Sequence, residues 1–282
     1  MQDYSKRRLT YETDKFPAIS ALAKLISEEN PGQEYLAGLW KSDLHRGLLW
    51  SPFPKRNVQD VLEPCSHGYR FKHVSQEYIA PSWSWASCPG PVNWLGEING
   101  RLPADSAFFP EYRLLNAEVV AADRTNLYGR VSSACLELEA KLLRVPLGGD
   151  GKAKVVKNAD TEKTYTFGFL YLNTTHAFLS PSDEYVANFS LDWDSPSLGI
   201  SDSANEPVEQ MWMMLTSSIQ HKKPLENQSR GFAPGENCLG LLLLPTENER
   251  EFIKVGIWLY HLYKHQGKRQ WEGIQPQSIR IV

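Results

Sequence analysis

The sequence has few cysteines, and they lie far apart. Cys65, Cys88, Cys135 and Cys238 are four in 282 residues, and no two of them have the spacing of a redox or disulfide motif. A chain of this length buries a core without covalent cross-links. We therefore expect reduced thiols in an intracellular, cytoplasmic protein.

Long apolar runs and an excess of one charge are also missing. The longest apolar run, Cys238 to Leu244, is far shorter than the roughly 20 residues of a membrane helix. The amino terminus is charged and lacks the apolar segment of a signal peptide. The net charge is −3, and basic and acidic residues alternate along the chain. These features predict no membrane span and no nucleic-acid partner.

Catalytic and cofactor motifs are absent as well. The sequence contains no nucleophile elbow, dinucleotide fingerprint, P-loop or metalloprotease motif. Cys65, His67, His73 and Cys88 are residue types that bind zinc, but their spacing is not a recurrent zinc spacing. We expect a chain without catalysis of its own, without a metal and without a cofactor.

Aromatic residues are abundant, and helical signals stand at the start. Nine Trp, twelve Tyr and eleven Phe suit a β-rich core. Pro17 lies in the first turn of a predicted helix that residues 30–32 end. A second, short helix is expected over 43–50. The spacing of the apolar residues predicts one buried face on the first helix, made of Phe16, Ile19, Leu22, Leu25 and Ile26.

Beyond residue 77 the signals are those of strands without intervening amphipathic helices. In the stretch 129–145, Leu136, Leu138 and Ala140 alternate with charged residues, as in a strand with one face in a core. The predicted fold class is α+β, a small helical segment on a mostly antiparallel β-sandwich or barrel. We expect a helical segment at 1–50, a linker loop at 51–77 and a β-rich domain at 78–282. Strands are expected at 112–122, 129–145, 164–172, 187–193, 210–216, 238–244, 252–260 and 278–282.

Residues 78–87 read Tyr-Ile-Ala-Pro-Ser-Trp-Ser-Trp-Ala-Ser. The alternation of Ser and Trp predicts a half-buried strand with Trp83 and Trp85 on one face and Pro81 at a sheet edge. The two rings either fill a core or form an aromatic platform for a ligand or sugar. Burial in a core is the more usual arrangement for such a pair.

Two other groups of residues are candidate sites. Asp192 and Asp194 flank Trp193 and share a strand face, as a glycosidase pair of carboxylates does. Two acids on one short strand more usually face water or cap a turn. His45 and Arg46 either contact an anionic partner or belong to a solvated helix face.

Several blocks of the sequence are similar to one known family. The stretch 78–87 resembles the signature that follows the conserved domain of fungal heterokaryon-incompatibility (HET-domain) proteins. Residues 4–10 and 13–23 resemble the segment that closes that domain. Residues 36–40 and 48–50 resemble the block that follows it. The β-rich carboxyl region of the family resembles residues 128–131, 191–193 and 252–257.

The resemblance implies a role in non-self recognition and in programmed cell death after fusion of unlike fungal cells, through a protein partner. The most conserved motifs of the family would lie upstream of Met1, so we expect either the carboxyl part of such a protein or a shortened relative. The HET domain is similar to TIR-type signalling domains, some of which cleave NAD, and such chemistry would lie upstream.

Three functions remain open from the sequence. The first is a non-catalytic regulatory or recognition region of a HET-type protein. The second is a β-sandwich module that binds carbohydrate or another ligand, which Trp83, Trp85, Asp192 and Asp194 would serve. The third is part of a TIR-like NAD-cleaving enzyme. We favour the first, because the second expects secretion and the third expects alternating strands and helices. The polar loops 195–208 and 221–237 are expected to carry partner specificity.

Overall fold

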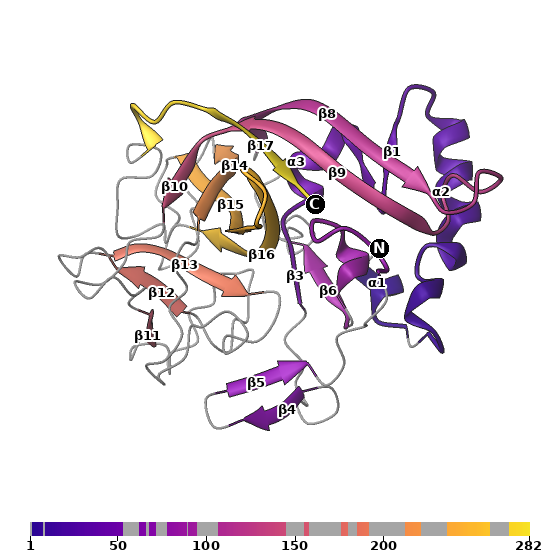
Figure 1. The fold of residues 1–282 in the computed structure, drawn as a ribbon, viewed down its shortest axis with the longest axis horizontal. Coiled ribbons are helices and arrows are strands. Elements are labelled where there is room, and N and C mark those ends of the chain that lie inside the picture. Colours follow the sequence, from indigo (N-terminus) through magenta and orange to yellow (C-terminus); the bar gives the residue numbers. More distant parts are fainter. Residues whose placement is uncertain are drawn as a thin grey trace, which may run out of the picture.

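The fold is known from a computed structural model, which describes residues 2–7, 9–52, 62–65, 68–71, 78–88, 90–94, 107–144, 155–157, 176–179, 185–191, 212–220, 236–259 and 271–282. Short helices gather near the amino terminus, and a large curved sheet forms most of the remaining described structure (Figure 1). The helices are α1 (Gln2–Ser5), η1 (Glu12–Asp14), α2 (Pro17–Glu29), η2 (Lys41–Asp43), α3 (Leu44–Gly47) and η4 (Trp85–Ser87).

Helix α2 begins and ends where the sequence predicts. Pro17 occupies its first position, where the missing N–H costs no hydrogen bond, and the N–H of Asn30 donates to the Ile26 carbonyl at its end. The predicted burial is only half correct. Phe16, Ile19 and Ala23 are buried, whereas three residues expected on the buried face are exposed: Leu22, Leu25 and Ile26. The chain covers one side of the apolar arc and leaves the other side open.

Three small two-stranded sheets accompany the main one. The first joins β1 (Tyr35–Leu36) to β2 (Leu39–Trp40). The second joins β3 (Trp50–Pro52) to β6 (Val92–Trp94). The third joins β4 (Leu62–Cys65) to β5 (Gly68–Phe71), so the segment 51–77 contains a hairpin where the sequence suggested a plain loop. The division of the chain at 50 and 77 remains a prediction.

The main sheet has eleven strands among the described residues. Along one path it runs β8, β9, β17, β16, β15, β14, with β7 and β10 both beside β14. From β16 it also extends through β13, β12 and β11. These strands are β7 (Ala107–Pro110), β8 (Tyr112–Ala121), β9 (Val131–Ala140), β10 (Leu142–Arg144), β11 (Val155–Lys157), β12 (His176–Leu179), β13 (Tyr185–Leu191), β14 (Trp212–Gln220), β15 (Glu236–Pro245), β16 (Glu251–Leu259) and β17 (Gln277–Ile281).

The pairing confirms the predicted fold class. The pairs are antiparallel apart from β16 with β17, which is parallel. The described strands form a sandwich-like α+β fold and no closed barrel. The expected strands at 112–122, 129–145, 210–216, 238–244, 252–260 and 278–282 all have counterparts in this sheet, and β13 overlaps the one expected at 187–193. The strand expected at 164–172 lies outside the described residues.

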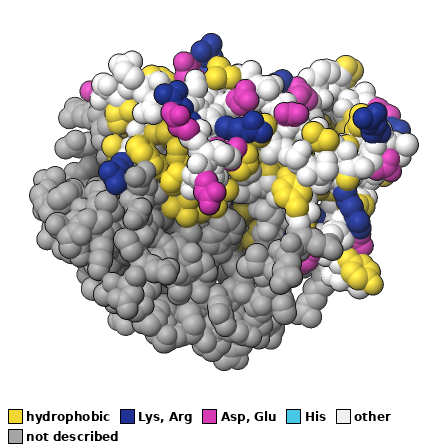
Figure 2. All heavy atoms as spheres, in the orientation of Figure 1, with side chains coloured by type: hydrophobic (Ala, Val, Ile, Leu, Met, Phe, Trp, Pro, Cys, Tyr) yellow, Lys and Arg dark blue, Asp and Glu magenta, His cyan; other side chains and the backbone are white. Residues whose placement is uncertain are grey.

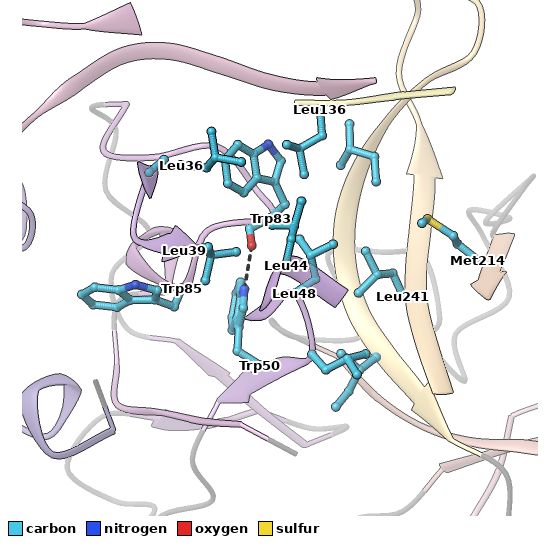
Figure 3. Packing of buried hydrophobic residues seen from close by; sticks show 14 of the residues in the cluster. Leu36, Leu39, Leu44, Leu48, Trp50, Trp83, Trp85, Leu136, Met214 and Leu241 are labelled. Carbon is cyan, nitrogen blue, oxygen red and sulfur yellow. Dashed lines mark hydrogen bonds between the residues drawn. The ribbon is translucent and has the colours of Figure 1, made fainter. Parts of the chain in front are cut away.

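One core joins the helical segment to the sheet. Leu136, Leu138 and Ala140 of β9 are buried, as their alternation predicts. They belong to the same cluster as Leu36, Leu39, Leu44 and Leu48 from the amino-terminal segment and Met214 and Leu241 from β14 and β15 (Figure 3). The first fifty residues therefore share one hydrophobic core with the sheet.

The segment 78–88 is not a strand. It forms a turn followed by η4, and Ser84 caps η4 by accepting a hydrogen bond from the Ala86 N–H at 3.2 Å. The Ser84 N–H donates to the Pro81 carbonyl. These local hydrogen bonds replace the pairing that the alternation of Ser and Trp suggested. The expected burial is confirmed, with Trp83 0% and Trp85 2% exposed.

Candidate functional site

Residues 82–88, here called the tryptophan turn, are held by segments far away in the sequence. The N–H and the hydroxyl of Ser82 both donate to the main-chain oxygen of Val282. The Lys254 N–H donates to Ser82 Oγ at 2.9 Å. Ser84 Oγ donates to the Ala37 carbonyl at 2.7 Å. Two serine hydroxyls therefore connect the turn to three distant parts of the fold.

Indole nitrogens make the second set of connections. Trp50 Nε1 donates to the Trp83 carbonyl at 2.8 Å, as the dashed line in Figure 3 shows. Trp85 Nε1 donates to the Gly38 carbonyl at 3.1 Å. Trp94 Nε1 donates to the Gly47 carbonyl at 3.0 Å. These three indole N–H groups thereby gain the partner that burial demands, whereas the buried Nε1 atoms of Trp83 and Trp271 have no hydrogen-bond partner among the described residues.

The β1–β2 turn is shaped to receive Trp85. Ala37 and Gly38 have positive φ angles of 43° and 94°. A Cβ at position 38 would lie 2.5 Å from Trp85 Nε1, closer than side chains tolerate. Glycine is therefore required here both by the backbone angle and by the close approach of the indole.

Lys15 fastens the amino-terminal segment to the tryptophan turn. Its side chain is largely buried, and Nζ donates to the Ala86 carbonyl at 3.0 Å and to the Cys88 carbonyl at 2.5 Å. The ammonium also pairs with the Glu12 carboxylate. A lysine ammonium has three donors, and three acceptors occupy them. This arrangement suits a structural tie.

Lys254 is a second buried ammonium. The side chain is 0% exposed, and Nζ lies 3.5 Å from the ring centre of Trp50 and donates to the Trp50 carbonyl at 3.3 Å. The π face stabilises a cation that has lost its water. Sequence reasoning missed this residue, although a signal existed. Lys254 lies two residues after Phe252, so both side chains point to the same buried face of β16. A lysine is unusual at such a position.

Aromatic edges surround Trp85. The ring centres of Tyr4, Phe16 and Trp94 lie 5.9, 6.1 and 6.4 Å from its own, all in edge-on contacts. Both rings of the predicted platform are buried, so neither Trp83 nor Trp85 offers a face to a ligand in solution. The geometry fits the core interpretation of this pair.

His45 and Arg46 lie half-buried against the sheet. Ser217 Oγ donates to the His45 carbonyl at 2.8 Å, and the Arg46 guanidinium lies 5.1 Å from the ring centre of Phe108. Arg46 also approaches the Asp43 carboxylate at 3.5 Å. Burial lowers the pKa of His45, against the opposing effect of Asp43. Both residues contact the sheet, and the Arg46 side chain remains 41% exposed. The anion-site and solvated-face interpretations of this pair both stay predictions.

A polar pair between β14 and the residue that joins β7 to β8 completes this region and was not foreseen from the sequence. Ser218 Oγ donates to Glu111 Oε1 at 2.6 Å. The pair connects the start of β8 to β14, and the Glu111 N–H also donates to the Thr216 carbonyl. These contacts place β7 and β8 against β14.

The other predicted site residues are not brought together among the described residues. Asp192, Asp194, His67 and His73 lie outside them, as do most of the loops 195–208 and 221–237. Cys88, Cys135 and Cys238 are buried thiols. In the part of the chain that the structure describes, no group of three His, Cys, Asp or Glu residues is placed to hold a metal ion.

The comparisons with known proteins add no relative. No protein-family model, curated protein or solved structure matches this chain. Within the described ranges, no helix has the length and apolar character needed to cross a lipid bilayer. The fold and the site therefore define a structural class. It is the class of mixed α and β proteins, here with an amino-terminal helical segment packed on a curved, mostly antiparallel sheet.

Proposed function

We propose that this chain is a non-catalytic regulatory or recognition region of a HET-type protein, acting in non-self recognition and programmed cell death in the cytoplasm through a protein partner. One observation carries the proposal. Four of the separate sequence blocks that resemble the HET family meet at the tryptophan turn.

Four blocks supply the contacts. Lys15 comes from 13–23, Gly38 from 36–40, Trp50 from 48–50 and Lys254 from 252–257, and each bonds to the turn or to a residue that does. Chance matches along a chain have no reason to converge in space. Their convergence supports a resemblance to one packed unit.

The carbohydrate-binding alternative loses one of its supports. It relied on Trp83 and Trp85 as an aromatic platform, and both rings are buried. Its other support, Asp192 with Asp194, lies outside the described residues.

The proposal is tested by deleting the gene in one of two fungal strains whose fused cells die. We expect the uptake of a vital dye in fusion cells to fall to the level of self-fusions, and a wild-type copy to restore it. Unchanged cell death in the deletion strain would contradict the proposed role.

A further inference from the structure

The open side of α2 carries an apolar row. At roughly 100° per residue, the apolar side chains from Phe16 to Ile26 occupy about half of the helix circumference. The chain buries only the part with Phe16, Ile19 and Ala23. The rest forms the outer α2 face, defined as Leu22, Leu25 and Ile26, which are 57%, 53% and 38% exposed.

The spacing along this face is that of a helix–helix seam. Ala18, Leu22, Leu25 and Glu29 follow one another at intervals of four, three and four residues. Such a 4-3-4 spacing places side chains on one line and is the pattern through which two helices pack. Ala18 and Glu29, at the two ends of the line, are also exposed.

The terminal turns of α2 do not compensate its dipole. Its first turn has no acidic residue and its last turn has no basic residue, whereas Glu28 and Glu29 stand at its carboxyl end. Lys24, one turn further in, lies 3.9 Å from the Glu28 carboxylate. Because the dipole is negative at the carboxyl end and positive at the other, a carboxylate such as Glu29 is better placed beside a helix start than at its own helix end.

We propose that the outer α2 face binds the same face of a second copy of this chain, with the two helices antiparallel about a two-fold axis. In this register Leu22 packs on Leu25 of the other copy, twice. Glu29 lies beside the other copy's Ala18, at a helix start that lacks an acidic residue. A parallel arrangement would bring the two acidic ends together.

The edge strand β8 is a poorer candidate. Strand β8 pairs only with β9 among the described strands. It carries Arg113 and Glu118 on exposed positions and has a register shift at Leu115. Charges and bulges on an edge strand hinder pairing with another sheet.

The dimer is expected to be weak, because α2 has 13 residues and spans only about 20 Å. Sedimentation of the full chain should show a monomer at a few micromolar and a dimer whose Kd is on the order of 100 µM. Leu25→Lys should weaken this association at least tenfold. The matched control is Leu115→Lys on β8, which is exposed to a similar degree, at 44%, and should leave the association unchanged.

A mixing experiment tests the antiparallel register. Leu22→Glu and Leu25→Lys should each be monomeric alone, since each sets its charge against leucine twice. Mixed together, they should form a heterodimer with one Glu–Lys contact and one Leu–Leu contact. A wild-type chain that stays monomeric to about 500 µM, an equal effect of Leu115→Lys, or a mixture that does not associate would each overturn the proposal.

Discussion

Indole hydrogen bonds fix the core at the level of single residues. Trp50, Trp85 and Trp94 each pair a ring nitrogen with a main-chain carbonyl of another segment. Breaking such a pair leaves a buried carbonyl unsatisfied, which costs about 1–3 kcal/mol beyond the lost packing. Substitutions among these tryptophans therefore affect both hydrogen bonding and volume.

Trp83→Ala should lower the free energy of unfolding by about 3–5 kcal/mol, because the side chain is 0% exposed and its removal leaves a cavity. Thermal denaturation measures the change. The control is Leu127→Ala on the exposed β8–β9 turn, which should have the same melting temperature as the wild type. If Trp83→Ala also melts with the wild type, its ring is not a core element.

Gly38→Ala should destabilise the protein by about 2–4 kcal/mol, since strain at a positive φ adds to the contact with Trp85. Gly32→Ala is a matched control. Gly32 has nearly the same φ, 92°, but nothing within 4 Å of an added Cβ. Urea denaturation of both variants separates the two effects, and equal losses would show that the indole contact is unimportant.

The burial of Tyr35 makes the stability of the fold sensitive to alkaline pH. Burial, with a smaller contribution from Tyr4, raises the pKa of Tyr35 well above its ordinary value of 10. The unfolded chain loses this proton near pH 10 while the folded chain retains it. The free energy of unfolding is therefore unaffected by Tyr35 below that pH and falls as the pH rises above it.

The test compares urea denaturation at about pH 8 and about pH 11. Tyr35→Phe should lose less stability between the two than the wild type does. Tyr11→Phe, at an exposed position, should behave as the wild type. An identical loss in Tyr35→Phe would show that other groups control the alkaline transition.

At the scale of elements, one side chain connects the β8–β9 hairpin to the amino-terminal segment. The Arg130 guanidinium donates to the carbonyl and the hydroxyl of Thr13, each at 3.1 Å, and to the Asp14 carboxylate at 2.9 Å. The ring centres of Tyr35 and Tyr128 lie 5.5 Å apart beside it. Figure 1 shows the hairpin reaching across to α2. These contacts align the hairpin with the helical start.

The loops 195–208 and 221–237 are predicted to set partner range. Recognition often lies on loops that a rigid scaffold holds, and surface loops tolerate exchange. Replacing each segment by an unrelated polar sequence of the same length should leave the melting temperature within a few degrees and change which tester strains trigger cell death on fusion. Chimeras that fold and keep the parental range would place recognition elsewhere.

Periodicity predicted the regular elements and failed at the turn. The ends of α2 and the alternation of β9 are local patterns, and the structure contains both. The tryptophan turn is held by Val282, Lys254 and Ala37, whose proximity no local pattern encodes. Periodicity likewise gives the width of the apolar arc of α2, but not which part of it the chain covers.

At the scale of the molecule, charge is distributed without a dominant sign over the described face that Figure 2 presents. Figure 2 shows basic and acidic side chains intermixed with apolar ones over the described face. The net charge of −3 agrees with this distribution. Long-range electrostatic attraction is therefore a minor part of any association, and partners would be selected by local contacts.

The chain alone should not cleave NAD. The prediction rests on the sequence, which has no phosphate-cradling glycine loop and no alternation of strands and helices after residue 77. Incubating the purified chain with NAD and following nicotinamide by chromatography is the measurement. Turnover that is proportional to protein concentration and survives repurification would contradict the prediction.

The hydrogen bond between Ser82 and Val282 spans 200 residues of sequence. Strand β17 also lies between β9 and β16, so neither of these strands can complete its pairing on that side before β17 has been synthesised. During synthesis on the ribosome, the tryptophan turn emerges long before the strand that anchors it. The amino-terminal half must remain incompletely packed over that interval, which makes its apolar surfaces a natural target for chaperones.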